Sequence, residues 1–342
     1  MTVRLERVSV DEVPWSELDT RPDRTVFQTR EWLEFLRSTQ HAEPVAAQLF
    51  DGDRPVGWFS GAVVRRGGLP VLGSPLPGWS TSYMGFTTDR SDLGWKAISA
   101  LADFAFRSLG CVHFEVMDRN LSLTPDSEAL PRAVVSPFRG YQLELRDDAT
   151  MLSGMSPTAR RNIRRSESKS VVVEEVDQPG FAEFVTEYYS QVTKVFAKRQ
   201  LVPTFPIERV ESLIQHLHPT GHLLLLRART AEGLSVATGI FPGIPRASAG
   251  FYMGASEVTR PDVRPNEAVM WHAIRTWRDR GSVSFDFGGG GEYKAKFGGA
   301  PIVVPWVRWS KYRGMDQMRN AVRSGSKLAQ RVRGRLEAPR GG

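Results

Sequence analysis

Periodic apolar positions divide the first 145 residues into strands and amphipathic helices. Trp32, Phe35 and Leu36 share one face of a helix predicted over 31–36, with Thr29 as its N-cap. A second helix is predicted over 93–109. Strand-like runs cover 45–50, 55–64, 83–86, 112–117 and 141–145. Pro and Gly crowd residues 69–79, which predicts an irregular loop.

The remaining sequence shows the same mixture of elements. Ser156 and Pro157 suit the N-cap and first position of a basic helix. Further helices are predicted over 181–199, 207–218 and 266–280. Strands are predicted over 171–176, 221–228, 235–241, 248–253 and 302–309, and the middle three are expected to form an antiparallel meander. The pattern therefore predicts a mixed α/β protein.

The two halves share an internal repeat. Tyr83-Met84-Gly85 matches Tyr252-Met253-Gly254, and after each comes a predicted helix that ends in glycine. A strand with an aromatic residue and a carboxylate then follows, Phe114-Glu115 in the first half and Phe285-Asp286 in the second. The repeat predicts two copies of one mixed α/β domain.

A glycine- and lysine-rich stretch, residues 284–299, has no counterpart in the first copy. Four glycines end its strand after Phe287, and glycine lets a backbone come close to a ligand. Lys294 and Lys296 follow between Tyr293 and Phe297. A cation on a loop after a buried strand is a common way to place positive charge at a site. Chemistry is therefore expected mainly in the second copy, although a solvated surface turn gives the same pattern.

Length and composition favour a cytoplasmic protein of two domains. The chain has 342 residues, 41% of them hydrophobic, and no run of about 18 apolar residues that would span a membrane. The first residues mix charges and do not resemble a signal peptide. The single cysteine, Cys111, suits a reducing compartment and is expected to be a buried structural thiol.

Positive charge is concentrated in the C-terminal tail, residues 313–342. The net charge is +7, and the tail holds eight Lys or Arg against two Asp or Glu. Its apolar residues recur at three- and four-residue steps, which predicts a basic amphipathic helix. Such a helix is suited to bind the anionic inner face of a membrane, or the phosphate backbone of a tRNA. A solubilising tail is the third interpretation.

Several other site types are excluded by the motifs. The run Gly288–Gly291 lacks the "G-x-x-x-x-G-K-(S/T)" pattern of a P-loop, and no Gly-x-Ser-x-Gly elbow occurs. His216, His218 and His222 lie close together, but no zinc-binding pattern accompanies them. No metal site and no tightly bound cofactor are expected.

The sequence resembles the FemABX-like aminoacyltransferases, which belong with the tandem GNAT-fold acyltransferases. Phe285-Asp286-Phe287-Gly288-Gly289 followed by Tyr293-Lys294-Ala295-Lys296-Phe297-Gly298 is similar to the C-terminal signature of that family. The helix Arg160–Arg165 resembles its "R-x-x-I-R-(K/R)" segment, and Phe27–Trp32 resembles its N-terminal entry. The resemblance implies two tandem GNAT-like domains, each a mostly antiparallel mixed sheet flanked by helices. We expect them at 1–150 and 151–312, followed by the tail.

The resemblance also implies roles for individual residues. Lys294 matches the family lysine near the reacting carbonyl, where a cation would stabilise the oxyanion of acyl transfer. Asp286 is the second catalytic candidate, either as a group that aligns Lys294 or as an acceptor of a hydrogen bond from the attacking amine. Substrate-binding candidates are Arg160, Arg164, Tyr252, Gly289, Tyr293, Lys296 and Phe297. Arg160 and Arg164 lie four residues apart, so they are expected on one helix face, where guanidinium forks suit phosphate; an exposed charged face is the alternative.

The family implies transfer of an aminoacyl group from aminoacyl-tRNA to an amine of a cell-wall precursor or peptide-like acceptor. The alternative is an acyl-CoA-dependent N-acyltransferase acting on an amino sugar or polysaccharide precursor. The pyrophosphate loop of acetyl-CoA enzymes, "(Q/R)-x-x-G-x-(G/A)", is absent after both Gly85 and Gly254. A non-catalytic protein that binds RNA or a membrane surface is the third hypothesis. The chain is expected to be a monomer or a homodimer.

Overall fold

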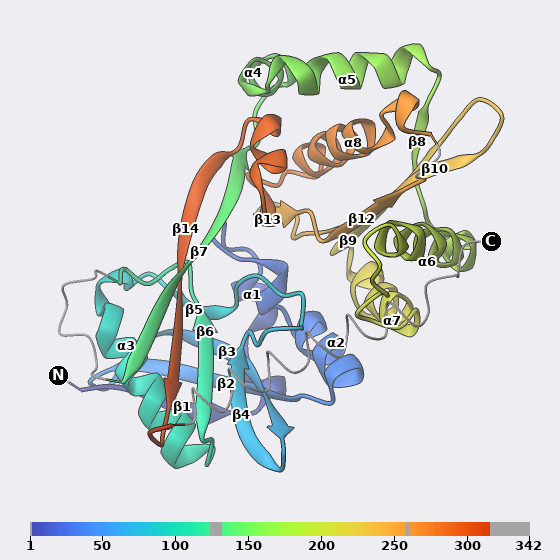
Figure 1. Ribbon diagram of the computed structural model, residues 1–342. Coiled ribbons are helices and arrows are strands. Elements are labelled where there is room, and N and C mark those ends of the chain that lie inside the picture. The colour runs from blue at the N-terminus through green and yellow to red at the C-terminus, as the bar shows by residue number, and fades with distance from the viewer. Residues whose placement is uncertain (1, 124–131, 258–259, 315–342) are drawn as a thin grey trace. The chain divides into compact units, whose positions relative to one another are not determined.

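The computed structural model describes residues 2–123, 132–257 and 260–314. These form two compact units (Figure 1). Of the described residues, unit 1 comprises 2–123, 132–140, 246–248 and 301–313, and unit 2 comprises 141–245, 249–257, 260–300 and 314. The predicted tail helix lies outside the described residues, apart from Arg313 and Gly314.

Unit 1 is built on a mixed sheet whose strands run in the order β1-β2-β3-β4-β6-β14-β7. Neighbouring strands are antiparallel where their register is defined, except that β4 and β6 are parallel, and β5 pairs with β3. The strands are β1 (Val3–Val8), β2 (Glu43–Asp51), β3 (Arg54–Arg66), β4 (Leu69–Ser74), β5 (Gly85–Thr88), β6 (His113–Met117), β7 (Ala133–Glu144) and β14 (Ala300–Ser310). Its helices are α1 (Trp15–Leu18), α2 (Arg30–Gln40) and α3 (Gly94–Asp103), and a π-helical turn, Phe104–Ser108, continues α3.

The prediction of a loop over 69–79 is wrong in its first half, because Leu69–Ser74 is the strand β4, and its last four residues are buried. Gly73 suggested a loop, yet it is required by packing. A Cβ built there would lie 2.3 Å from Leu76 Cγ and 2.8 Å from Trp79 Cη2, so the following chain folds directly over the strand. The strand therefore carries glycine for reasons of space rather than of turn formation.

Unit 2 contains the antiparallel sheet β12-β10-β9-β8. Its strands are β8 (Val172–Glu175), β9 (Leu223–Arg229), β10 (Ser235–Pro242) and β12 (Met253–Ser256). Helix α8 (Pro265–Asp279) packs on β9 and β10, and α6 (Phe181–Ala197) packs on β10 and β12. The two helices lie on opposite faces of β10. Thr238 faces α6, where its Oγ1 donates to Gln191 Oε1, and the neighbouring Gly239 lies against Val269 of α8. Trp277 Nε1 of α8 also donates to Phe241 O.

Three further helices and two strands complete unit 2. The helices are α4 (Asp148–Gly154), α5 (Pro157–Ser168) and α7 (Glu208–Leu217), and the strands are β11 (Ser248–Gly250) and β13 (Ser284–Gly289). The expected N-cap is present, since Ser156 Oγ accepts from Ala159 N and Pro157 begins α5. The core around Phe241, Phe285 and Trp277 is apolar and fully buried.

A fork in the backbone separates β11 from β12. Phe251 N donates to Asp286 O of β13, and the next residue, Tyr252, donates from its N to Ile240 O of β10. Two successive residues thus donate backbone hydrogen bonds to two different strands. The residues that follow them, in β12, pair with β10. The fork therefore separates the course of β12 from that of β13, within unit 2.

The predicted repeat is present as structure. In each unit a helix ends before a glycine with positive φ, Gly110 at 66° and Gly281 at 85°, and a buried strand follows. Cys111 is fully buried in the core of unit 1, as expected, and burial raises the pKa of its thiol to about 11. Within the described residues, no helix combines the length and apolarity that crossing a membrane requires.

Asp118 stabilises unit 1 from a buried position after β6. Its Oδ2 accepts from Phe86 N at 2.5 Å, and its Oδ1 accepts from Asn120 N and Leu121 N at 2.8 and 2.6 Å. Burial raises the pKa of the Asp118 carboxyl to about 6, although the three backbone N–H groups oppose the shift. The native state therefore favours the protonated carboxyl relative to the unfolded chain.

We expect this carboxyl to make folding pH-dependent. Its contribution to stability is full below a pH of about 4 and is lost as the pH rises through about 6. Relative to Asp118→Asn, the wild-type free energy of unfolding should fall by about 2–3 kcal/mol between about pH 4 and pH 7. Urea titrations at several pH values measure this difference. A difference between the two proteins that does not change with pH would contradict the assignment.

Candidate acyl-transfer site

Lys294 lies folded back over the end of β13. It belongs to the short 3-10 helix η7 (Glu292–Phe297), between β13 and β14. Its Nζ donates to Phe287 O at 2.5 Å and to Gly289 O at 2.6 Å. Burial lowers the pKa of Lys294, and the negative charge of Asp286 opposes this shift. An ammonium has three N–H donors, and the third has no partner among the described residues.

Glycines allow the strand end to meet this ammonium. Gly288 has φ 68° and Gly290 has φ 123°, values that side chains disfavour. Asp286 lies below them, and its Oδ1 accepts from Gly288 N at 2.5 Å. Asp286 is buried, so its carboxylate fixes the turn at the strand end as well as placing negative charge near Lys294.

A cavity of about 200 Å³ lies beside this lysine at the backbone fork. Its wall includes Phe251, whose ring centroid is 5.3 Å from Lys294 Nζ. Most of the wall is apolar, and its polar groups come from Thr238, Ser256 and Asn266. The lining residues are Val195, Thr238, Gly239, Phe241, Phe251, Gly254, Ala255, Ser256, Asn266, Val269, Met270 and Tyr293.

The cavity is shaped by close packing at the sheet. A Cβ on Gly239 would lie 2.5 Å from Phe241 Cε2, and one on Gly254 would lie 3.0 Å from Phe251 Cε2. Asn266 Nδ2 donates to Ser256 Oγ at 3.0 Å, which joins α8 to β12 across the cavity wall. A small apolar space with a few fixed polar groups and an adjacent cation suits a reacting carbonyl group.

Lys296 does not point into this cavity but forms an ion pair. Its Nζ lies 2.6 Å from Glu267 Oε1, and the two side chains are 16% and 9% exposed. The same Oε1 accepts from Asn162 Nδ2 at 3.0 Å. Glu267 lies in the first turn of α8, so this cluster joins α5, α8 and η7.

The two predicted phosphate-binding arginines have different environments. Arg160 is half-buried, and its Nη1 donates to Leu152 O, Ser153 O and Met155 O at 3.2, 3.2 and 2.7 Å. It therefore satisfies carbonyls at the end of α4. Arg164 is exposed on the outer face of α5. The substrate-binding role of both residues stays a prediction, and the structure gives Arg160 a structural contact.

The three aromatic candidates are likewise separated. Phe297 is fully buried and stacks on Phe287, with ring centroids 5.7 Å apart. Tyr252 faces α7, where it lines a small space with Arg209 and Leu213. Of these candidates, Tyr293 lines the cavity beside Lys294. Gly289 does not line it, but its carbonyl accepts from Lys294 Nζ.

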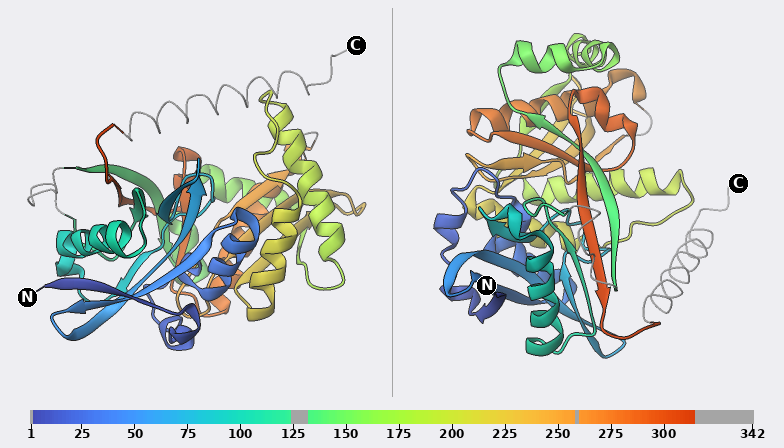
Figure 2. Two further views of the ribbon diagram at one scale, coloured as in Figure 1. Left: turned by 90° about the horizontal axis from the view of Figure 1, so that it is seen from below. Right: turned by 90° about the vertical axis from the view of Figure 1, so that its left-hand side faces the viewer.

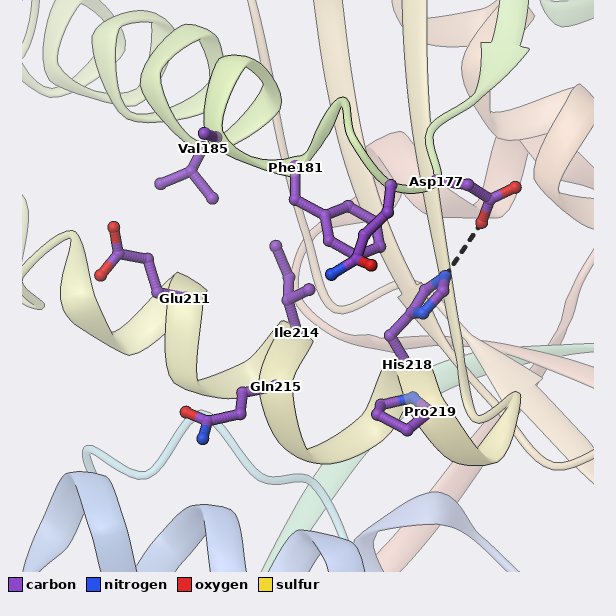
Figure 3. Close-up of a pocket in the computed structure, with 10 residues that line it drawn as sticks. Asp177, Phe181, Val185, Glu211, Ile214, Gln215, His218 and Pro219 are labelled. Atoms are coloured by element: carbon purple, nitrogen blue, oxygen red, sulfur yellow. Dashed lines mark hydrogen bonds and ion pairs between the residues drawn. The ribbon is translucent and has the colours of Figure 1, made fainter.

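A larger cavity of about 770 Å³ lies between α6 and α7 (Figure 3). Figure 3 shows Phe181 and Val185 facing Ile214 across it, with His218 and Asp177 paired at one end. The His218 Nε2 to Asp177 Oδ1 distance is 2.9 Å. Phe251, whose ring lies beside Lys294 Nζ, lines the smaller cavity and not this one, so we do not assign the chemistry to the larger cavity. In the described part of the chain, no group of His, Cys, Asp and Glu could hold a metal ion.

Comparisons with known proteins agree with this geometry. Residues 155–296 match the family model of the acetyltransferase (GNAT) domain. This range runs from just before α5 into η7 and includes both Lys294 and the fork. A search of curated proteins finds no match to the sequence.

Solved structures share the fold at low sequence identity. FemX is similar with a TM-score of 0.65 and 13% identity, covering 89% of this chain and 96% of that one. A tandem GNAT protein from the clavulanic acid biosynthesis pathway has a TM-score of 0.51 and 10% identity, covering 91% and 99%. L-PGS from Bacillus licheniformis has a TM-score of 0.51 and 14% identity, covering 84% and 94%.

Residues 155–296 carry a GNAT acetyltransferase domain, and the chain is therefore an acyltransferase. The expected FemABX-like, tandem GNAT fold and the mixed α/β class are confirmed. The GNAT domain also confirms the prediction of an enzyme over that of a non-catalytic binding protein.

Several residues of the GNAT site were missed by sequence reasoning. Phe251 and Asn266 reach the cavity only because the fork and the start of α8 converge on it. Glu267 and Asn162 lie about 105 residues apart in sequence, and no local pattern joins them. An acidic residue such as Glu267 in the first turn of a helix is typical of a helix N-terminus. That pattern does not predict its ion pair with Lys296.

Replacing Lys296 should test its structural role. Lys296→Met leaves the buried Glu267 carboxylate without its cation, and we expect a loss of about 3 kcal/mol in the free energy of unfolding. Lys296→Met/Glu267→Gln removes the unpaired charge and should recover part of the loss. Urea denaturation measures both. Unchanged stability with a raised KM for substrate would instead support the substrate-binding role.

Proposed function

We propose that this acyltransferase moves an aminoacyl group from aminoacyl-tRNA to an amine of a cell-wall precursor or peptide-like acceptor. The observation that carries the proposal is the Lys294 ammonium, held by two strand-end carbonyls beside an apolar cavity of about 200 Å³. The lysine, Asp286, Gly289 and Tyr293 are the residues we assign to the site.

The proposed reaction is nucleophilic acyl substitution. The acceptor amine attacks the ester carbonyl carbon of the donor, and the carbonyl oxygen becomes an oxyanion. The third N–H of Lys294 donates to that oxyanion, and the half-buried surroundings strengthen the interaction. The carbon–nitrogen bond forms, the ester carbon–oxygen bond breaks, and the amine proton passes to the leaving ribose oxygen.

The start of α8 supports tRNA over acyl-CoA as the donor. Anions bind where several backbone N–H groups are free at a helix N-terminus. Here Pro265 occupies the first helical position and has no N–H, and the buried Glu267 carboxylate lies in the same turn. Both features disfavour a pyrophosphate at this helix end. The fold likeness to FemX gives further support.

An acyl-CoA donor with an amino sugar acceptor is the second candidate. The match to the acetyltransferase (GNAT) domain and the fold likeness to the tandem GNAT protein favour it. The cytoplasmic location, a peripheral contact of the tail with an anionic membrane and the oligomeric state stay predictions.

Lys294→Met should lower kcat by roughly 10²–10³-fold, because it removes one donor to the oxyanion while keeping the length of the side chain. Single-turnover rates with saturating donor measure the effect. Lys198→Met, at an exposed lysine of the same unit, is the matched control and should leave the rate unchanged. Equal rates for wild type and Lys294→Met, with both proteins folded, would remove Lys294 from the chemistry.

Ribonuclease treatment should separate the two donors. If aminoacyl-tRNA is the donor, acyl transfer from a charged tRNA mixture stops when ribonuclease is added before the enzyme. Product formation from acyl-CoAs in place of tRNA, insensitive to ribonuclease, would overturn the tRNA assignment. The assay follows radiolabelled amino acid or acetyl group into an amine acceptor.

A further inference from the structure

The outer face of α5 carries a compact group of cations. Arg161, Arg164 and Arg165 are all exposed, and Lys169 follows at the C-cap. Their three- and four-residue spacing places the arginines on one side of the helix, within about 6 Å of axial rise. The opposite side is buried, through Ala159, Asn162, Ile163 and Ser166. We call Arg161, Arg164, Arg165 and Lys169 the α5 cation face.

No close ion pair in the described part of the chain neutralises the charge of this face. Among the described residues, none of its four cations lies within ion-pair distance of a carboxylate. Most other cations on the helices and strands of unit 2 are paired, including Arg227, Arg229, Arg275, Arg278, Arg280, Lys194 and Lys296. The single carboxylate on α5, Glu167, is exposed and forms no such pair. An unneutralised group of three guanidiniums is a site for phosphate groups.

Helix α5 is held rigidly against the loop that carries Lys294. Ser156 N donates to Lys296 O at 2.9 Å, and Asn162 Nδ2 donates to Glu267, the partner of Lys296. Arg160 fixes the other side through the carbonyls at the end of α4. Figure 1 and the right-hand view of Figure 2 show α5 at the edge of unit 2 with α8 beside it. A polyanion bound to the α5 cation face is therefore anchored close to the acyl-transfer loop.

We propose that the α5 cation face binds the phosphodiester backbone of the donor tRNA. This inference rests on the proposed function, and it assigns a docking surface to the RNA part of that donor. A membrane surface is the less favoured partner for a structural reason. Helices that lie on membranes insert apolar side chains. Apart from Pro157 at its start, the exposed residues of α5 are polar or charged, and Ala159 and Ile163 are buried against unit 2.

The test compares two double variants that remove the same charge. Arg164→Gln/Arg165→Gln changes the α5 cation face, and Lys198→Gln/Arg199→Gln changes two exposed cations after α6. Binding of uncharged tRNA to the full chain is measured by fluorescence anisotropy over a series of salt concentrations. We expect the α5 variant to bind about tenfold more weakly, with a salt slope smaller by about 2, and the control to match wild type. Circular dichroism melting confirms that both variants fold.

The outcomes separate this inference from the proposed function. If wild type binds no tRNA, the proposed donor fails. If wild type binds tRNA and the α5 variant binds equally well, or the control loses as much, the docking surface is wrong while the donor assignment stands. If the α5 variant instead loses binding to vesicles of phosphatidylglycerol and keeps tRNA binding, the face serves a membrane and the inference is overturned. In the transfer assay, the α5 variant should raise KM for aminoacyl-tRNA and leave kcat unchanged.

Discussion

The buried carboxylate of Glu267 is the contact on which the site region of unit 2 depends. It accepts from Lys296 Nζ at 2.6 Å and from Asn162 Nδ2 at 3.0 Å, and the Glu267 side chain is 9% exposed. A carboxylate at that depth is tolerated only with its partners in place, because an isolated buried charge costs several kcal/mol. The start of α8, the middle of α5 and the loop η7 are therefore fixed together. Lys294 lies two residues from this contact, so its position is set by the same cluster.

The geometry around Lys294 shows how a fold can prepare an ammonium for catalysis. Two carbonyls orient it before any substrate arrives, and partial burial keeps water from screening it. The fork between β11 and β12 provides the space beside it, since Phe251 and Tyr252 turn their N–H groups to different strands. Cation and cavity thus arise from two backbone irregularities, the glycine turn after β13 and the split in the neighbouring strand.

Local patterns in the sequence were sufficient for most elements and for the glycine- and lysine-rich loop. The helix capped by Ser156, the antiparallel strands of unit 2 and the buried Cys111 follow from spacing that neighbours in sequence determine. The prediction failed at Leu69–Ser74, where glycine serves packing against Trp79, a contact invisible to a propensity argument.

The site could be predicted only in part, because side-chain direction depends on distant residues. Arg160 and Arg164 were expected on one face, yet contacts with α4 draw one guanidinium inward and leave the other exposed. Phe297 belongs to the same motif as Lys294, but its ring stacks on Phe287 in the core and does not reach the cavity. Phe251 and Glu267 carried no local signal. Phe251 matters because the strand splits there, and Glu267 matters because it pairs with Lys296, two elements later in the chain.

The glycines of the lysine loop differ in how much evolutionary freedom they retain. Gly298 has φ 83°, and a Cβ there would lie 2.9 Å from the backbone of Gly154, so both conformation and space exclude other residues. Gly291, in contrast, has φ −69° and open space around its missing side chain. Relatives of this enzyme can therefore diverge at position 291 while position 298 stays unchanged. A sequence motif that requires all four glycines of 288–291 would miss relatives that differ at position 291. A motif based on Lys294 and Gly298 would include them.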